Sequence, residues 1–145
     1  MKFKEITLSD IEIISNIYTE TFSSEPWNEP WTEEISNKRL KQMINCEGFF
    51  GLIAYEEDSP VGMILGNEEY SFRGLEFYIK EFCTSNTVRG KGVGTFILNE
   101  FQERLKSRGV SEVWLLTSKE ETTEGFYNRR GYTSCNDWVL MRKKL

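Results

Sequence analysis

Three glycines at alternate positions constrain this chain more than any other feature: Gly90, Gly92 and Gly94. They separate an apolar run typical of a strand, Leu75–Cys83, from a run with helical spacing, Phe96–Leu105. Because glycine has no Cβ, the backbone here can approach a ligand closely, and the first helical N–H groups lack intrahelical acceptors. A helix N-terminus attracts anions such as phosphate. The stretch Val88–Leu98 therefore predicts an anion-binding strand–loop–helix, assisted by Arg89 and Lys91.

The spacing of these glycines argues against two common phosphate-binding motifs. A dinucleotide-binding G-x-G-x-x-G fingerprint that starts at Gly90 would need its third glycine where Thr95 stands. A Walker A loop requires G-x-x-x-x-G-K-S/T, which this stretch does not contain. The pattern that fits is R-x-x-G-x-G, formed by Arg89, Gly92 and Gly94. A glycine-rich turn without a ligand and a nucleotide-binding module remain as alternatives.

Size, charge and missing residue types narrow the function classes. A chain of 145 residues predicts one compact domain over residues 1–145. With 18 basic and 23 acidic residues the net charge is −5, which disfavours nucleic-acid binding and suits a small cationic amine or a peptide amine. The chain has no histidine, which excludes histidine-based triads and histidine-ligated metal sites, and we expect no metal.

The cysteines and the apolar runs predict where the protein is found. Three cysteines lie far apart without a C-x-x-C pair, which is typical of reduced thiols in a cytoplasmic protein: Cys46, Cys83 and Cys135. No run approaches the roughly 18 apolar residues of a membrane span, and Met1–Glu5 has no signal-peptide character. We therefore expect neither secretion nor membrane insertion.

Hydrophobic periodicity predicts an α/β fold with a mixed sheet covered by helices, in the order β-α-α-β-β-β-α-β-α-β. The predicted strands are Phe3–Ile6, Phe49–Tyr55, Val61–Gly66, Leu75–Thr84, Val110–Thr117 and Tyr132–Met141. The predicted helices are Asp10–Phe22, Glu33–Asn45, Thr95–Arg108 and Glu121–Arg130. Ser9 with Glu12 predicts a capping box, Thr32 predicts a second cap, and Gly109 and Gly131 predict helix ends.

The loop pattern and this element order together resemble the GNAT family of N-acetyltransferases, over nearly the whole chain. A second signature, Tyr127-x-x-x-Gly131-Tyr132, is similar to the Y-x-x-x-G-F/Y segment of that family. The resemblance implies acetyl-CoA as co-substrate and transfer of its acetyl group to a primary amine by direct attack on the thioester. A non-catalytic acyl-CoA sensor on the same fold is the main alternative. Dimers are frequent among relatives, so the resemblance also allows a homodimer.

The resemblance assigns cofactor-binding roles to these residues: Cys83, Thr84, Arg89, Gly90, Lys91, Gly92, Val93, Gly94 and Thr95. The loop amides would hold the pyrophosphate, and a backbone N–H near Cys83 or Thr84 would stabilise the thioester oxygen. Tyr127 would protonate the departing thiolate as a general acid, with ordinary aromatic packing as its alternative role. Many relatives carry, about seven residues before this Tyr, an Asn that contacts the pantetheine arm or CoA. This chain has Glu120 at that position, so we do not assign this contact to it.

A general base is expected on the strand Leu75–Thr84, where several relatives place one. Strand alternation puts Glu81 in phase with apolar residues from Leu75 to Cys83, and such surroundings raise a carboxyl pKa. The alternatives are pairing of Glu81 with a nearby Arg or Lys, or a side chain that faces solvent beyond a bulge. Glu76 lies on the other face and is expected to be solvated. Without a histidine to activate it, the Cys83 thiol is expected to be structural rather than nucleophilic.

The loop Ser23–Trp31 carries two indoles and two carboxylates. In the family the region between the first two helices helps to wall the acceptor site. Trp27, Glu29 and Trp31 are therefore the predicted substrate-binding residues, because charge and cation–π contacts could hold a cationic amine. A loop anchored on the core by its tryptophans is the alternative. Phe72 and Arg73 are further candidates for the rim of the site.

Overall fold

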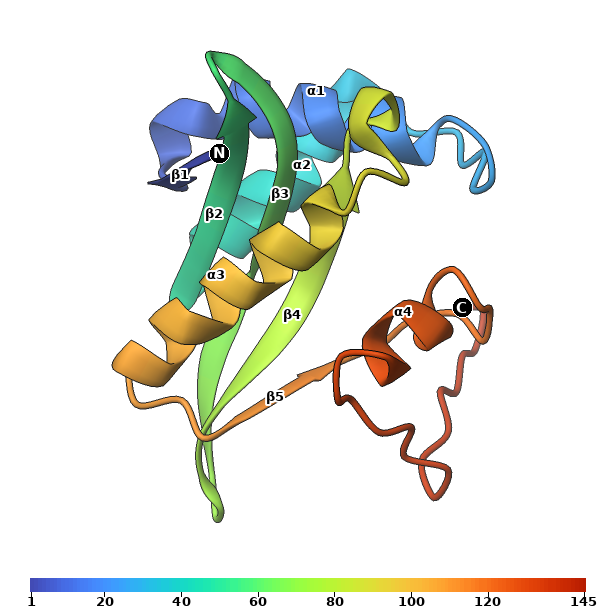
Figure 1. Ribbon diagram of the computed structural model, residues 1–145. Coiled ribbons are helices and arrows are strands. Elements are labelled where there is room, and N and C mark those ends of the chain that lie inside the picture. The colour runs from blue at the N-terminus through green and yellow to red at the C-terminus, as the bar shows by residue number, and fades with distance from the viewer. The chain divides into compact units, whose positions relative to one another are not determined.

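The computed structural model describes residues 1–145, and the chain divides into two units, Met1–Leu115 and Leu116–Leu145. The first unit is built on a five-stranded sheet in the order β1-β2-β3-β4-β5 (Figure 1). Its strands are β1 (Lys2–Glu5), β2 (Phe49–Glu56), β3 (Ser59–Ser71), β4 (Gly74–Thr84) and β5 (Glu112–Leu115). The first four pair antiparallel and β5 pairs parallel to β4, which confirms the predicted mixed sheet.

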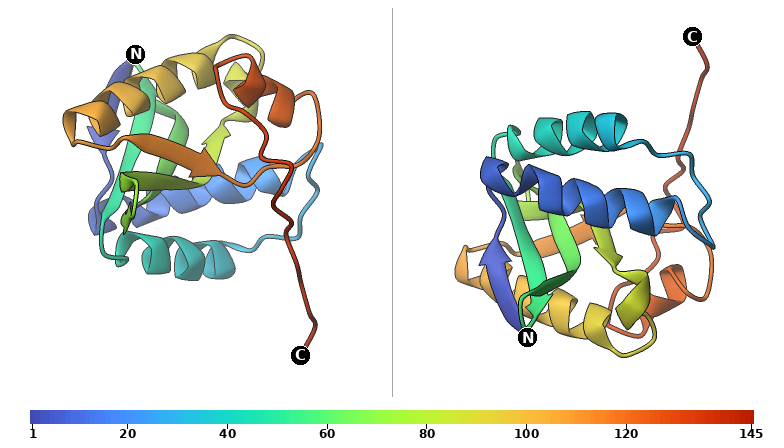
Figure 2. Two further views of the ribbon diagram at one scale, coloured as in Figure 1. Left: turned by 90° about the horizontal axis from the view of Figure 1, so that it is seen from below. Right: turned by 90° about the horizontal axis from the view of Figure 1, so that it is seen from above.

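Three helices cover the two faces of this sheet. The helices α1 (Ile11–Phe22) and α2 (Glu33–Ile44) pack together on one face, and α3 (Val93–Ser107) lies on the other (Figure 2). Two short 3₁₀ helices, η1 (Leu8–Asp10) and η2 (Asn86–Val88), precede α1 and the glycine loop. No helix in this structure is both long enough and apolar enough to cross a membrane.

The helix ends follow local sequence signals, with one exception. The N–H of Ile35 donates to Thr32 Oγ1 at 3.3 Å, which confirms Thr32 as the cap of α2. Gly109 follows α3 with φ +86°, as expected for a residue that ends a helix. The capping box predicted at Ser9 is wrong, because the pair forms two residues earlier, between Thr7 and Asp10. There the Thr7 N–H donates to Asp10 Oδ2 at 2.9 Å.

The sheet has a separate apolar core on each face. On the α1 and α2 side, buried residues from five elements form one cluster: Ile6, Ile14, Ile17, Tyr18, Leu40, Met43, Ile53, Met63, Leu65 and Cys83. On the α3 side, the fully buried Phe101 packs between Phe50 and Phe77, with ring centroids 5.3 Å away in both cases. Both faces of the central strands are therefore buried, and this fixes their register.

A β-bulge interrupts the pairing of β3 with β4. Leu65 of β3 lies opposite Glu81, whereas the next residue, Gly66, lies opposite Ile79. Lys80 is therefore the extra residue in β4. A bulge shifts the alternation of side chains by one residue. The odd-numbered residues of β4 therefore face one side of the sheet before Lys80 and the other side after it.

The contacts of β4 show this shift. Phe77, before the bulge, packs against Phe101 of α3. Glu81 and Cys83, after the bulge, lie on the side of α1 and α2. The prediction that Glu81 is buried is confirmed, but the prediction that it shares a face with Phe77 is wrong, because the sequence does not reveal the bulge.

Two strand lengths also differ from the sequence-based prediction. β3 and β4 continue to Ser71 and Gly74, so their hairpin extends well beyond the predicted end of β3 at Gly66. β5 keeps only four residues, and its pairing with β4 stops at Ile79 opposite Leu115. Beyond Ile79, the rest of β4 pairs with β3 alone.

The second unit contains one short helix, α4 (Glu124–Asn128), which Gly131 follows with φ +86°. The predicted strand Tyr132–Met141 is wrong, because these residues form no helix or strand. A turn at Asn136 and Asp137, closed by a 3.4 Å hydrogen bond from the Trp138 N–H to the Cys135 carbonyl, divides the segment. Asn and Asp favour turns because their side chains bond to nearby backbone groups. That the whole chain is one domain stays a prediction.

Candidate functional site

The glycine loop joins β4 to α3 as the sequence predicts. After η2, Gly90 and Gly92 both adopt φ +79°, a left-handed conformation that side chains with a Cβ rarely take. Gly92 is the N-cap residue of α3. A Cβ added at either glycine would meet no atom within 4 Å, so the space over the loop is open. The glycines therefore serve the backbone conformation and the access to it.

The backbone N–H groups of this loop are available to a ligand. No hydrogen bond within the chain uses the amides of Gly90, Gly92, Val93 and Gly94. The Thr95 N–H, in contrast, donates to the Gly92 carbonyl at 3.0 Å and starts the helix. Amides that converge at a helix N-terminus, with the helix dipole behind them, form an anion site.

Both cationic side chains of the loop have partners within the chain. Arg89 Nη1 donates to the Glu25 carbonyl at 2.9 Å, its Nη2 donates to Asn86, and its Cζ lies 5.0 Å from the centroid of the Trp27 ring. Lys91 Nζ donates to the Thr87 carbonyl at 3.0 Å. Arg89 therefore connects the glycine loop to the loop between α1 and α2.

The end of β4 offers one amide that points away from the sheet. The Ser85 N–H donates to the Val61 carbonyl of β3 at 2.8 Å. Antiparallel pairing alternates, so Cys83 also bonds to β3 while the N–H and C=O of Thr84 point the other way. The Thr21 hydroxyl of α1 donates to the Thr84 carbonyl at 3.4 Å, in agreement with this direction. Of the two predicted residues, Thr84 is the one whose amide is open.

Glu81 lies in a buried cluster of polar side chains between β4, α1 and α2. It is 8% exposed. Arg39 of α2 donates to its Oε1 from Nε at 2.8 Å and from Nη2 at 2.6 Å, and the Tyr18 hydroxyl of α1 donates to the same oxygen at 3.4 Å. Burial raises the pKa of the Glu81 carboxyl above 4.5, and the Arg39 charge opposes this rise without cancelling it. The upward shift of the pKa expected for a base and the cation pairing given as the alternative are thus both present.

Arg39 and Tyr18 were not predicted as site residues. They are separated from Glu81 by 42 and 63 positions along the chain, so no local motif connects them. Tyr18 also packs against Trp31, with ring centroids 4.9 Å apart, and burial raises the pKa of its hydroxyl. Arg39 Cζ lies 5.6 Å from the centroid of the Trp31 ring. Only the tertiary fold brings these groups together.

Two further residues of β4 are structural. Glu76, expected to be solvated, is instead buried and accepts hydrogen bonds from Ser71 Oγ at 2.8 Å and Arg73 Nε at 3.0 Å, which hold the tip of the hairpin. The Cys83 thiol is buried in the apolar cluster, and burial raises its pKa to about 12. A thiol with so high a pKa is a poor nucleophile at neutral pH, in agreement with the sequence-based expectation.

The predicted substrate-binding residues of the loop Ser23–Trp31 all have partners within the first unit. Trp27 packs against Phe22, with ring centroids 5.2 Å apart, and lies under Arg89. The indole N–H of Trp31 donates to Glu29 Oε2 at 2.6 Å. Each indole therefore already contacts an arginine of the protein: Trp27 contacts Arg89 of the glycine loop, and Trp31 contacts Arg39 of the Glu81 cluster.

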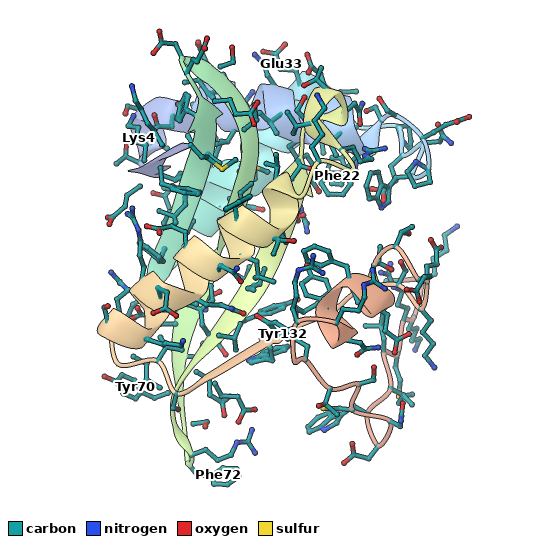
Figure 3. All side chains as sticks on the ribbon, in the orientation of Figure 1. Lys4, Phe22, Glu33, Tyr70, Phe72 and Tyr132 are labelled. Atoms are coloured by element: carbon teal, nitrogen blue, oxygen red, sulfur yellow. The ribbon has the colours of Figure 1, made fainter.

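The remaining predicted residues lie elsewhere. Phe72 is 93% exposed at the tip of the β3–β4 hairpin, and Figure 3 shows it at the end of the sheet opposite Phe22. Phe72 is therefore distant from the loop Ser23–Trp31, which follows Phe22, and does not line a common site with it. Tyr127 belongs to the second unit, where its ring centroid lies 5.2 Å from that of Phe126 and 5.4 Å from that of Tyr132. Burial raises the pKa of its hydroxyl. Its role as general acid stays a prediction.

Comparison with known proteins places this arrangement in context. A family model described as the acetyltransferase (GNAT) family matches residues 11–132. A crystal structure of "a possible acetyltransferase" from Clostridium difficile 630 is similar, with TM-score 0.81, 15% identity and coverage of 99% of this chain and 97% of the other. So is a predicted acetyltransferase with acetyl-CoA from Clostridium acetobutylicum, with TM-score 0.72, 18% identity and coverage of 97% and 95%.

An aminoglycoside acetyltransferase from an uncultured soil metagenomic sample, crystallised with trehalose, has TM-score 0.74 and 17% identity. The match covers 99% of this chain and 95% of that one. At these identities the solved structures show a shared fold. The family model covers most of the chain, including the glycine loop and β4.

Proposed function

The chain belongs to the GNAT acetyltransferase family, and from this premise we propose that it transfers an acetyl group from acetyl-CoA to a primary amine. The acceptor is a small cationic molecule or a peptide amine. The observation that carries the proposal is the N-terminus of α3, where two left-handed glycines leave four backbone amides without acceptors in the chain.

The glycine loop has the chemistry that a pyrophosphate requires. The amides of Gly90, Gly92, Val93 and Gly94 supply neutral donors at the positive end of a helix. Arg89 and Lys91 add two positive charges to the same loop. A pyrophosphate bound here would compete with Glu25 and Asn86 for the Arg89 guanidinium.

The residues around the end of β4 can support the transfer itself. In the reaction the amine nitrogen bonds to the acetyl carbon, the carbon–sulfur bond breaks, and the amine gives up its protons. The open amide of Thr84 would stabilise the oxygen on which negative charge develops. Glu81, buried and with a raised pKa, would accept a proton from the acceptor ammonium. For Tyr127, which belongs to the second unit, the role stays the one that the sequence predicts, protonation of the departing CoA thiolate.

The acceptor is proposed from charge and from the loop between α1 and α2. A net charge of −5 favours a cation. Glu29 and Trp31 supply an acidic and an aromatic group beside the Glu81 cluster, and Trp27 supplies a second aromatic group beside Arg89 of the glycine loop, although each already has a partner. One solved relative is an aminoglycoside acetyltransferase, so aminoglycosides belong among the first amines to test.

The test has two stages. Thermal denaturation with acetyl-CoA, CoA, ADP or NAD should show stabilisation by the two CoA species well beyond that by ADP or NAD. Thiol release from acetyl-CoA is then measured with polyamines, aminoglycosides, amino acids and short peptides. Amine-dependent release supports the enzyme and identifies the acceptor class. Stabilisation by CoA without thiol release from any amine supports the acyl-CoA sensor. No stabilisation by either CoA species overturns both proposals.

A further inference from the structure

Arg39 binds Glu81 in an asymmetric way. An arginine often pairs with both oxygens of a carboxylate through two parallel hydrogen bonds. Here both guanidinium donors, Nε and Nη2, reach the same oxygen, Oε1, and the Tyr18 hydroxyl donates to it as well. No hydrogen bond within the chain reaches Oε2, and this atom is not among the buried polar atoms that lack a partner. One oxygen of Glu81 is held and the other is unbound.

The groups around Glu81 make this pair sensitive to the loss of the arginine. Tyr18 comes from α1, Arg39 from α2, and Glu29 from the intervening loop, where its negative charge raises the pKa of Glu81 further. Tyr78 and Cys83 of β4 are neutral at pH 7, since their own pKa values are raised. Arg39 is therefore the main positive charge that acts on the Glu81 carboxyl.

We propose that Arg39 is a positioning residue for acetyl transfer. By holding Oε1, it keeps Glu81 ionised and leaves Oε2 to take the proton that the acceptor ammonium loses before attack. The first proton passes from nitrogen to Oε2, and the nitrogen lone pair then forms the new carbon–nitrogen bond. The carbon–sulfur bond breaks as CoA leaves, and the second proton that the nitrogen loses balances the proton gained by the CoA thiolate. This inference rests on the proposed function, and it gives α2 a part in the chemistry without contact between Arg39 and the substrate.

Loss of Arg39 has a specific consequence for the pH dependence. A buried carboxylate without its cation becomes harder to ionise, so Glu81 would be protonated up to a higher pH. The variant enzyme should then be impaired most at low pH and recover at high pH. A substitution that only destabilises the fold would instead lower activity by a similar factor at every pH.

The chain provides a matched control. Arg108 Nε lies 2.5 Å from Glu68 Oε1, and its Cζ lies 4.6 Å from the centroid of the Phe50 ring. The Arg108 side chain is 40% exposed, against 42% for Arg39, so both arginines pair with a glutamate and cover an aromatic ring. Arg108→Gln thus removes the same charge from a comparable pair that does not involve Glu81.

The experiment measures kcat/KM for the best amine of the panel from pH 6 to pH 9 in the wild type, Arg39→Gln, Arg39→Lys and Arg108→Gln. Each variant is divided by the wild type at the same pH, which cancels the ionisation of the amine itself. For Arg39→Gln we expect this ratio to rise about tenfold or more across the range, since each unit of pKa is a factor of ten. Arg39→Lys should restore most of the activity at low pH, and Arg108→Gln should give a flat ratio.

A second readout does not depend on turnover. With glutamate labelled at the side-chain carboxyl carbon, NMR titration should show Glu81 ionising at a higher pH in Arg39→Gln, with Glu81→Gln assigning the signal. If Arg39→Gln does not fold, Arg39→Met, which removes the charge but keeps an apolar stem over the Trp31 ring, replaces it in both measurements. A flat activity ratio and an unchanged titration in an active protein would overturn the inference, whereas a wild type that releases no thiol would overturn the proposed function.

Discussion

Replacement of Gly92 by alanine tests the glycine loop most directly. Gly92 has φ +79°, and a Cβ at this position meets no atom within 4 Å. The cost to folding is therefore conformational rather than steric. A left-handed residue other than glycine costs about 1–2 kcal/mol. The reduced freedom of the unfolded chain returns about 0.4–1 kcal/mol, so Gly92→Ala should destabilise the fold by about 1 kcal/mol.

The effect on acetyl-CoA should be larger than the effect on the fold. An alanine at Gly92 favours negative φ, and relaxation toward it would turn the amides of Gly92 and Val93 away from a bound pyrophosphate. At a concentration of 100 Kd, acetyl-CoA stabilises the wild type by about 2.7 kcal/mol. A hundredfold weaker Kd leaves about 0.4 kcal/mol at the same concentration. We therefore expect the acetyl-CoA-dependent rise in Tm to disappear almost entirely.

Gly109 at the other end of α3 supplies the control. Its φ is +86°, and a Cβ there also meets no atom within 4 Å, so Gly109→Ala carries the same conformational cost. Without ligand both variants should melt about 3 °C below the wild type. Only Gly92→Ala should lose its response to acetyl-CoA in a thermal-denaturation titration. A full response in Gly92→Ala, or an equal loss in both variants, would refute the assignment of the loop.

Three further predictions concern the fold that supports the site. Gly66→Ala places a methyl group 1.9 Å from a backbone carbonyl oxygen of β4, so we expect a loss of more than about 4 kcal/mol by denaturant unfolding; a stable variant would contradict the bulge geometry. Burial raises the pKa of the Asp10 carboxyl, but the hydrogen bonds from Lys4 and Thr7 and the Lys4 charge together outweigh burial and hold this pKa below 3.8. The stability that Asp10 contributes is therefore present at neutral pH and lost as the pH falls through the lowered pKa. Asp10→Asn should flatten this acid limb of urea stability curves. Because the pKa of Cys83 is raised to about 12, Ellman's reagent should modify the exposed Cys135 quickly and Cys83 only on unfolding.

Much of the fold follows from signals that are local in the sequence. The helical spacing of the residues before Phe22, the Thr32 cap and Gly109 each act within one or two helical turns, and the structure has all three features as predicted. The glycine loop is equally local, since its conformation depends on the absence of a Cβ at Gly90 and Gly92. The candidate anion site could therefore be located from the sequence alone.

The Glu81 cluster could be predicted only in part. The carboxylate and its burial follow from the apolar composition of β4, but its partners come from helices 42 and 63 residues away. Which face Glu81 occupies depends on the register between β3 and β4, and an unbroken alternation of residues does not reveal the extra residue Lys80. The predicted last strand failed for a related reason: β propensity after Tyr132 does not supply a partner strand.

The extra residue in β4 also affects how residue roles are transferred between relatives. Before Lys80, the β4 residues 74–79 pair with the β3 residues 71–66. After Lys80, the β4 residues 81–84 pair with the β3 residues 65–62. At identities of 15–18%, an alignment can run through this strand without a gap even where a relative lacks the extra residue. Such an alignment leaves the hydrophobic pattern plausible but assigns Glu81 the face of Phe77. Alignments of this chain should therefore be anchored on each side of the bulge separately.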